Sequence, residues 1–243
     1  MKTNGKKVKQ SIPYSCFTGM ETAKKSRSKS RPSTSTVDFK KAYRQFLLKQ
    51  GKQPASVFAF CDDLKISEDE FYKQFGSFES LEKTIWQDFI TDTRKRLEAD
   101  ENYAAFSARE KILSFYFSLA EQLKRDRSFV LHQLKGWSKP GVLPVFLKGF
   151  KKSFDEWIKG VIAEGVKSGE IAKRPYLDER YYLLFWMHLM FILQFWSHDE
   201  SADFEKTDMA IEKSVNLAFD LIGKGILDNA IDFGKFLYQT AKN

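Results

Sequence analysis

The stretch GKQPASVFAFCDDLKISEDEFYKQFGSFESL, residues 51–81, decides the fold because its spacing is that of a helix-turn-helix. Apolar residues recur in it at intervals of three and four, which predicts one face of a short helix: Val57, Phe60, Cys61 and Leu64. Ser67 then occupies an N-cap position, and Glu70 follows three residues later as in a capping box. A second helix is therefore predicted to begin after a short turn.

The residues after Ser67 continue the pattern. Phe71 and Phe75 lie on the inner face of the second helix, and Gly76 is suited to the position just past its end. The run Ser77-Phe78-Glu79-Ser80 is typical of the cap of a third, longer helix. Upstream, residues 37–50 form an amphipathic first helix with lysines between the apolar positions.

At these residues the chain resembles the TetR family of one-component transcription regulators, and the resemblance covers roughly residues 37–91. The family pattern matches without gaps at its punctuating positions, which here read Phe46 with Gly51, Ser56-Val57, Ile66-Ser67, Phe71-Tyr72 with Phe75, and Gly76-Ser77-Phe78-Glu79-Ser80-Leu81. Three positions depart from it. Lys65 replaces the usual turn glycine, Phe78 replaces a commonly basic residue, and Glu68-Asp69-Glu70 is acidic where basic or small residues are usual.

The resemblance implies an all-α, TetR-like chain with a three-helix DNA-binding domain at 37–83 and a helical ligand-binding and dimerisation domain at 84–243. It further implies a homodimer that binds a near-palindromic operator in double-stranded DNA and releases it when an apolar small molecule binds. In the family, the last two long helices of each subunit commonly form a four-helix dimer interface.

The residues expected to contact DNA lie around the predicted turn. Tyr72 and Lys73 are assigned to the phosphate backbone, Gln74 to a base edge, and Lys83 to the next helix. Ser56 and Ser67 are expected to offer a hydroxyl or a helix start to phosphate, although Ser67 is first of all a cap. For Tyr72 the alternative is a ring packed between helices.

Charge is distributed unevenly along the chain. Residues 1–36 hold nine Lys or Arg against one Glu, so this segment carries the whole formal net charge of +8. Its composition predicts a disordered basic tail, either an arm for phosphates or the minor groove or merely a solvated leader. Residues 37–91 sum to −1, which is unusual for a DNA-binding domain.

The remainder reads as helix, and 42% hydrophobic residues suffice for a sizeable core. The most apolar stretch, 178–198, contains His188 and Gln194 and is too short for a convincing membrane span, so we expect a helix buried on several sides. Two cysteines make no disulfide framework, and Cys61 is predicted to be a small buried apolar residue. A reduced, cytoplasmic setting follows, and a membrane partner is not expected.

Enzyme chemistry, metal binding and cofactor binding find no motif in the sequence, which lacks a phosphate-binding loop, Cys/His metal spacing and a Ser-His-Asp signature. Aromatic residues at helical spacing are mostly core, and a few are expected to line an effector pocket. His188 is either a satisfied core histidine or a polar anchor in that pocket. The candidate ligand-binding residues are Phe115, His132, Trp137, Trp157, Trp186 and His188.

A second, shorter resemblance involves residues 196–207, WSHDESADFEKT, which are similar to part of the TetR-fold lipid-binding proteins of ubiquinone biosynthesis. It implies an alternative function, a lipid- or isoprenoid-binding protein that keeps the fold but no longer reads DNA. The acidic residues 68–70 favour this alternative, whereas the intact Phe71-Tyr72-x-x-Phe75 pattern and the basic tail favour the regulator. A membrane-surface role for the tail is a third possibility.

Overall fold

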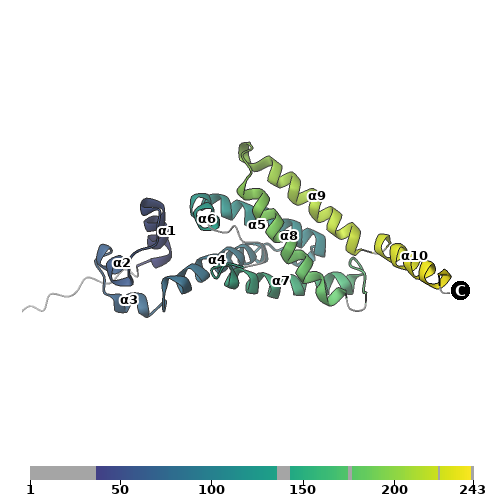
Figure 1. Ribbon diagram of the computed structural model, residues 1–243, viewed down its shortest axis with the longest axis horizontal. Helices are drawn as coiled ribbons and strands as arrows, with labels where there is room; N and C mark the ends of the chain where they lie inside the picture. The colour runs from purple at the N-terminus through teal and green to yellow at the C-terminus, as the bar shows by residue number, and fades with distance from the viewer. Residues whose placement is uncertain (1–36, 136–142, 175–176, 224, 242–243) are drawn as a thin grey trace, which may run out of the picture. The chain divides into compact units, whose positions relative to one another are not determined.

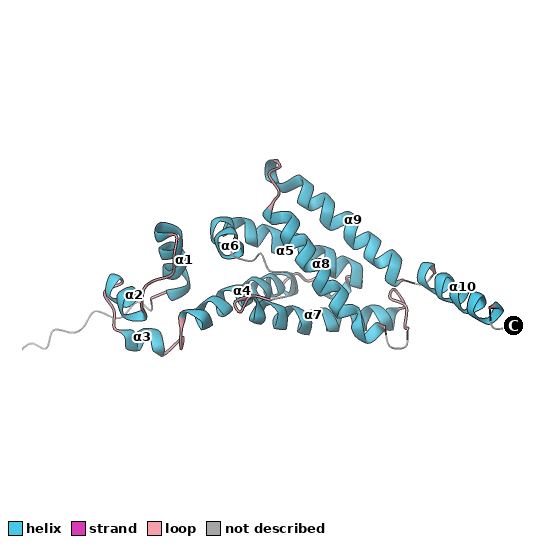
Figure 2. Ribbon diagram, viewed as in Figure 1, coloured by secondary structure: helices cyan, strands magenta, loops and turns pink. Residues whose placement is uncertain are grey.

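This computed structural model describes residues 37–135, 143–174, 177–223 and 225–241. In these residues, helices joined by loops are the only regular secondary structure (Figures 1 and 2). The α-helices are α1 Phe39–Gln50, α2 Val57–Asp63, α3 Glu68–Tyr72, α4 Phe78–Glu98, α5 Ala108–Arg125, α6 Arg127–Leu134, α7 Leu147–Ser168, α8 Tyr181–Ser197, α9 Glu205–Ile222 and α10 Ile226–Thr240. Short 3₁₀ turns occupy Tyr103–Ala105, Asp178–Arg180 and Ala202–Phe204. The predicted all-α class is confirmed, and the predicted tail at 1–36 lies outside the described residues.

Side-chain caps set the helix starts in the N-terminal head, α1 to α3. Asp38 accepts a hydrogen bond from the Lys41 amide at 3.0 Å, and Ser56 accepts one from the Ala59 amide at 3.0 Å. Ser77 opens α4 in a capping box, where it accepts from the amide of Ser80 and Ser80 accepts in return. Because each cap satisfies an amide that the helix itself leaves unpaired, these few polar residues fix where the helices begin.

The turn between α2 and α3 ends α2 in a Schellman motif. The amide of Ile66 donates to the carbonyl of Cys61, and the amide of Lys65 donates to that of Asp62, both at 3.0 Å. This geometry requires a left-handed residue, and Lys65 adopts it with φ +59°. Lysine therefore stands where glycine would be free of strain.

Helix α3 differs from the sequence expectation. Ser67 accepts from the amide of Asp69 at 3.1 Å, and the carboxylate of Glu70 turns away to pair with Lys73, so the predicted Ser67–Glu70 capping box does not form. α3 ends at Tyr72. The Glu70 carboxylate is therefore held by the ammonium of Lys73 on the exposed side of the helix.

Packed aromatic rings hold the three helices of the head together. The ring of Phe71 is fully buried and contacts rings from α1, α2 and the start of α4 at centroid distances between 5.4 and 6.4 Å: Phe39, Phe60, Phe75 and Phe78. Most of these contacts are edge-to-face, the arrangement that ring quadrupoles favour. Each ring removed from water contributes about 2 kcal/mol, which compensates for the small size of the head.

The body begins within α4. This helix runs without a break across the predicted boundary between residues 83 and 84, and it packs against α5 and α7. α8 lies against α7 and α9, and α9 lies against α5. Asp38–Asn243 form one compact unit, so α4 belongs to the head at its first turn and to the body thereafter.

The prediction that residues 178–198 are buried on several sides is wrong. In α8, Phe185 and Leu189 are buried, while Met187 is 66% exposed and Leu184 and Phe191 are about half exposed. α9 likewise leaves Met209 and Leu217 exposed. A run of apolar residues cannot tell a second core face from an exposed face, and in the single chain one face of α8 is exposed. Among the described helices, none is both long and apolar enough to cross a membrane.

Candidate DNA interface and effector site

Exposed residues at α3 form the candidate DNA surface. Tyr72 is 52% exposed at the last position of the helix, and Lys73 and Gln74 are exposed in the turn that follows it. The Tyr72 ring meets only the edge of Phe71, at 5.6 Å, so it is not packed between helices. The structure therefore brings three of the predicted DNA contacts to one short segment, with Ser67 as the cap at its start.

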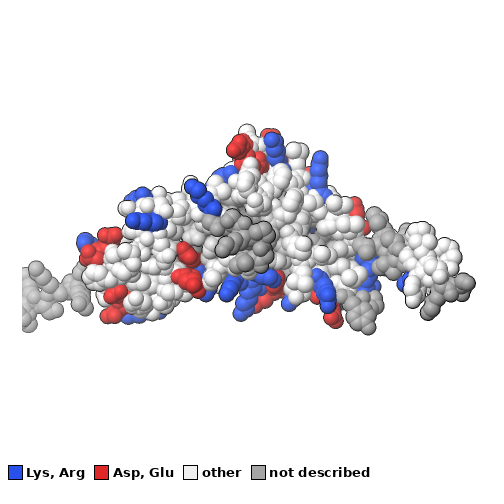
Figure 3. All heavy atoms as spheres, in the orientation of Figure 1, with Lys and Arg blue, Asp and Glu red and all other residues white. Residues whose placement is uncertain are grey.

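Both predicted lysine contacts are paired with acids in the free protein. Lys73 reaches Glu70 at 2.7 Å, and Lys83 reaches Glu79 at 2.7 Å. The hydrogen bond that Lys73 donates to Glu70 raises the pKa of Lys73, and the one that Lys83 donates to Glu79 lowers the pKa of Glu79. On the face shown in Figure 3, acidic and basic atoms alternate over this end of the molecule. Exposed pairs of this kind contribute little, so a phosphate can compete for either lysine.

Phe58 is a candidate contact that sequence reasoning missed. It lies in the first turn of α2, next to the cap Ser56, and 65% of its surface is exposed. The signal was present, because Phe58 falls off the apolar face defined by Val57, Phe60 and Cys61. Its exposure beside the start of α2 is what makes Phe58 a candidate for a contact outside the chain.

Polar side chains join the head to the body. The carboxylate of Glu82 on α4 accepts from the Tyr43 hydroxyl at 2.6 Å and from the Gln133 amide at 2.8 Å, so it ties α1 to α6. Arg44 on α1 donates to Asp126, at the start of α6, at 2.5 Å. Burial, and then Glu82, raise the pKa of Tyr43, which stays protonated as the donor. The position of α1 thus depends on the position of α6.

A small apolar cavity lies inside the body. It is lined by residues of α5, α7 and α8: Tyr116, Leu119, Ala120, Leu123, Phe150, Leu189, Ile192, Leu193 and Trp196. Its free space is about that of a single water molecule, and its lining offers no exposed polar surface. An apolar molecule of any size must therefore widen the cavity in order to enter.

Of the six predicted ligand-binding residues, the five that the structure describes lie at different places in the body. Phe115 and Trp157 stack on each other in the core with centroids 4.0 Å apart, and Trp186 lies at the α7–α8 contact. His132 is partly buried on α6, and Trp137 lies outside the described residues. None of the five described candidates lines the cavity. The spacing of the aromatic residues predicted helices correctly, but it did not identify the residues that line the cavity.

His188 lies where α8 meets α9. Its Nε2 is 2.7 Å from the Ser214 hydroxyl, which itself donates to the carbonyl of Ala210 at 2.5 Å. Since the hydroxyl proton is committed, Nε2 must be the donor, and Nδ1 is a buried acceptor without a partner among the described residues. Burial lowers the pKa of His188 to about 4, so the ring is neutral at physiological pH.

Comparison with known proteins places the chain. The family model described as "Tetracyclin repressor-like, C-terminal domain" matches residues 111–237, more than half of the chain. The chain belongs to the TetR family. That model covers the body and not the helix-turn-helix, so the N-terminal resemblance and the C-terminal match point to the same family from separate parts of the sequence. No curated protein sequence matches significantly.

Solved structures resemble the chain at low sequence identity. A protein of unknown function from Rhodococcus sp. RHA1 is 14% identical with a TM-score of 0.50, and the match covers 76% of this chain and 93% of that one. The fatty acid degradation regulator FadR from Bacillus halodurans is 15% identical with a TM-score of 0.48, over 77% and 97%. The TetR family regulator PfmR from Thermus thermophilus is 16% identical with a TM-score of 0.47, over 78% and 100%.

The likeness of residues 196–207 to lipid-binding proteins of ubiquinone biosynthesis is not borne out. In this TetR-family chain the segment builds the corner between α8 and α9. Asp199 is buried and accepts from the amide and hydroxyl of both Ser201 and Thr207, at 2.6 to 2.9 Å. Burial opposes ionisation, but these donors outweigh it and lower the pKa of Asp199 to about 2. Asp199, Ser201 and Thr207 thus stabilise the turn between α8 and α9.

An arginine braces the same corner from α6. The guanidinium of Arg127 lies 4.7 Å from the ring centre of Trp196 and 4.6 Å from that of Phe204. It also donates to the carbonyls of Trp196 and Asp199, each at 3.1 Å. Phe204 reaches this position only with a left-handed backbone, φ +63°. Among the described residues, no cluster of His, Cys, Asp or Glu is arranged to hold a metal ion.

Proposed function

We propose that this chain is a transcription regulator that binds operator DNA as a homodimer and releases it when an apolar small molecule enters the body. The observation that carries the proposal is the capped, aromatic-packed head, which presents Tyr72, Lys73 and Gln74 together and is fastened to the body through Arg44 and Glu82. A head that served only to stabilise the fold would not need to expose Tyr72, Lys73 and Gln74 on one segment. Each head of the dimer reads one half-site, so the operator is near-palindromic.

The dimer is supported by the apolar faces that α8 and α9 leave exposed. Met187 and Leu217 are both more than half exposed, and a soluble monomer rarely exposes a large contiguous apolar patch. Packing these faces on their symmetry mates gives a four-helix contact, which also fixes the distance between the two heads. That distance must match the spacing of half-sites one helical turn apart.

The route from effector to DNA runs through the α8–α9 corner. Trp196 lines the cavity, Arg127 is bonded to Trp196, and its neighbour Asp126 holds Arg44 on α1. A ligand that widens the cavity displaces Trp196, and that displacement is passed along this chain of contacts to the head. The ligand shifts the dimer only by its preference for one arrangement of the heads over the other.

The second candidate is a ligand-binding protein of the same fold that does not read DNA. It is favoured by Glu68, Asp69 and Glu70, which precede the exposed readers and repel phosphate. The two candidates differ in whether α3 discriminates between DNA sequences.

Substitutions on α3 test the choice, with the promoter DNA of the chain's own gene as probe and scrambled DNA of equal length as reference. Gln74→Ala is expected to reduce the preference for promoter DNA about tenfold. Lys73→Ala is expected to weaken binding to both DNAs about equally. Lys95→Ala is the matched control, since Lys95 is also an exposed lysine paired with an acid three residues away, Asp92. Equal affinities for all four proteins, without preference for the promoter, would establish the second candidate.

A further inference from the structure

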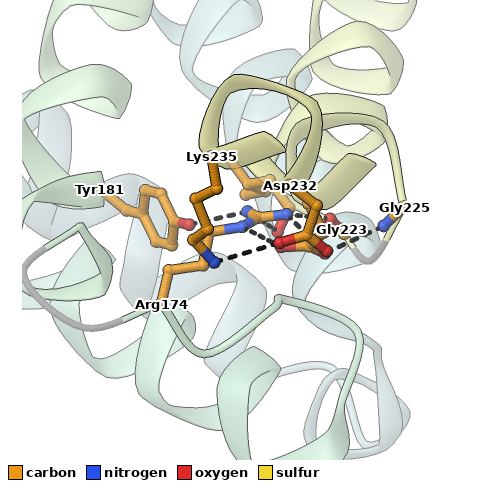
Figure 4. Close-up of polar contacts among 8 residues, drawn as sticks. Arg174, Tyr181, Gly223, Gly225, Asp232 and Lys235 are labelled. Atoms are coloured by element: carbon orange, nitrogen blue, oxygen red, sulfur yellow. Dashed lines mark hydrogen bonds and ion pairs between the residues drawn. The ribbon is translucent and has the colours of Figure 1, made fainter. Parts of the chain in front are cut away.

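A buried charge in the body finds a partner for every one of its donors. Arg174 is almost fully buried, and all five of its N–H groups are used (Figure 4). It donates to both carboxylate oxygens of Asp228 at 2.7 and 3.1 Å, to the Tyr181 hydroxyl at 2.9 Å, and to the carbonyls of Ile222 and Gly223 at 3.0 and 2.7 Å. Since most buried polar groups of proteins are paired in this way, a buried polar atom without a partner calls for an explanation.

Three buried polar atoms beside the apolar cavity have no hydrogen-bond partner among the described residues. They are Nε1 of Trp196, Nδ1 of His188 and Nε1 of Trp86. Trp196 lines the cavity itself. His188 packs on the cavity residue Tyr116 with ring centroids 5.1 Å apart, and Trp86 packs on the cavity residue Phe150 at 5.7 Å. An unpaired buried donor or acceptor costs about 1–3 kcal/mol, so this grouping favours a ligand that supplies the missing partners.

Two of these atoms belong to one stripe of α8. His188, Ile192 and Trp196 follow one another at intervals of four residues, so their side chains lie on the same side of the helix. Ile192, in the middle, lines the cavity as Trp196 does. The stripe is about 12 Å long, at roughly 1.5 Å per residue. One end therefore offers an acceptor, Nδ1 of His188, and the other end offers a donor, Nε1 of Trp196.

Neither water nor an anion suits this cavity. A water molecule there would find none of the polar partners that it needs, because the lining offers no exposed polar surface. No lining residue is charged, so an anion would have no counter-charge among them. Arg127 contacts Trp196, but its Nη1 and Nη2 groups donate to two backbone carbonyls. The fitting ligand is neutral.

We propose that the effector is a neutral, elongated molecule with an apolar body, a hydroxyl group at one end and a carbonyl oxygen at the other; the inference rests on the proposed function. As the ligand widens the cavity, its hydroxyl donates to Nδ1 of His188, its carbonyl accepts from Nε1 of Trp196, and its apolar body lies along Ile192. The Tyr116 ring must move to expose His188. It is weakly held, because its hydroxyl donates to the Phe185 carbonyl at 3.3 Å, longer than is usual for such a bond.

A series of ten-carbon probes tests this ligand class. Methyl ω-hydroxydecanoate carries both groups, at opposite ends of a chain about as long as the stripe. Methyl decanoate lacks the hydroxyl, and decanol lacks the carbonyl. Equilibrium dialysis against the full chain gives a dissociation constant for each probe. The preference for the hydroxy ester over each of the other two probes is the ratio of their constants. Comparing this ratio between protein variants cancels the difference in hydrophobicity between the probes.

Three variants, each keeping an aromatic ring, assign the two ends of the ligand. In His188→Phe the preference over methyl decanoate is expected to fall about tenfold, while the preference over decanol stays within twofold. In Trp196→Phe the reverse is expected. Trp86→Phe is the matched control, because it removes another buried, unpaired indole N–H from a residue that does not line the cavity, and both preferences should stay within twofold. Far-UV circular dichroism checks that each variant is folded.

The inference is overturned if the unmodified chain does not bind methyl ω-hydroxydecanoate, or if either His188→Phe or Trp196→Phe leaves both preferences within twofold. The proposed function is judged separately, by the release of promoter DNA. If methyl decanoate releases the DNA while the variants leave the preferences unchanged, the effector has another chemistry and the proposed function stands. If the hydroxy ester binds with the expected preferences but releases no DNA, the ligand class stands and the proposed release fails.

Discussion

Within the part of the chain that the structure describes, two turns place non-glycine residues in the left-handed conformation, and they are built in opposite ways. At the α2–α3 turn, Lys65 is held by the two backbone hydrogen bonds of the turn, and its side chain is exposed and lies 3.8 Å from its one ion-pair partner among the described residues, Asp62. At the α8–α9 corner, Asp203 and Phe204 are left-handed in succession, and the surrounding side chains hold them. The left-handed conformation costs about 1–2 kcal/mol per residue. Only at the second turn does this conformation place a side chain against a partner.

The α8–α9 corner uses its strain to place a ring. Phe204 can stack on Arg127 because its backbone is left-handed. Asp199 fixes the turn by accepting four hydrogen bonds from Ser201 and Thr207. Lys124 pairs with Asp203 at the same corner. Strain persists where the surroundings over-determine it, and this corner lies on the proposed route from the cavity to the head.

The largest effect is expected from removing the carboxylate that holds the corner. Asp199→Ala leaves the buried donors of Ser201 and Thr207 without an acceptor and should lower the free energy of unfolding by about 3 kcal/mol. Urea denaturation at pH 7 measures the change. Glu200→Ala, an exposed acid at the next position, is the control and should change it by less than about 0.5 kcal/mol. An Asp199 variant as stable as the control would show that the corner is not braced.

The same carboxylate predicts a pH dependence. The pKa of Asp199 is about 2 in the folded chain, below the ordinary value of 3.8. A depressed folded pKa contributes stability that is present above the unfolded value and is lost as the pH falls through the folded one, here about 2 kcal/mol between pH 5 and pH 2. The stability gap between the unmodified chain and Asp199→Asn should therefore shrink over this interval. A stability difference that stays constant from pH 5 to pH 2 would contradict an ionised Asp199 carboxylate held by hydrogen bonds.

Glycine at the corner should destabilise although it relieves strain. Phe204→Gly removes the ring from Arg127 and from Trp196, 6.1 Å away. The loss of a partly buried ring and of its cation–π contact outweighs the relief and should leave the chain about 1.5 kcal/mol less stable. Thermal unfolding followed by circular dichroism measures the difference. A stabilised variant would mean that the ring contributes nothing.

Glycine at the head turn should stabilise. Lys65→Gly removes the left-handed penalty and only a long-range ion pair with Asp62 at 3.8 Å, between two exposed side chains. After the entropy that glycine adds to the unfolded chain, a gain of about 0.5–1 kcal/mol is expected. The same substitution by glycine is therefore expected to change the free energy of unfolding in opposite directions at Phe204 and at Lys65. Destabilisation at both positions would contradict this expectation.

The head could be predicted because its information is local. Ser56, Ser67 and Ser77 each cap a helix in the structure as the sequence pattern indicates, and Lys65 was recognised as a departure at the turn. Two features of α3 were not predictable: its end at Tyr72, although the apolar spacing continues to Phe75, and the pairing of Glu70 with Lys73 rather than with a backbone amide. Choices between neighbouring partners are decided by geometry that the spacing does not contain.

The body's important residues could not be found in the same way. Arg127 and Arg174 join positions that lie far apart along the chain, and nothing in their immediate sequence marks them. The aromatic pattern that predicted a pocket described core residues such as Phe115 and Trp157, while the cavity is lined mainly by aliphatic residues. Periodicity shows that a residue is buried but not what it is buried against.

The central claim, that the head reads DNA, is tested most directly by binding to the promoter of the chain's own gene over a salt series, with the full chain and with a chain lacking residues 1–36. The account predicts that the shortened chain still prefers promoter over scrambled DNA and shows a shallower dependence on salt, because it has lost only phosphate contacts. If binding shows no sequence preference and disappears with the basic residues of 1–36, the head does not read DNA.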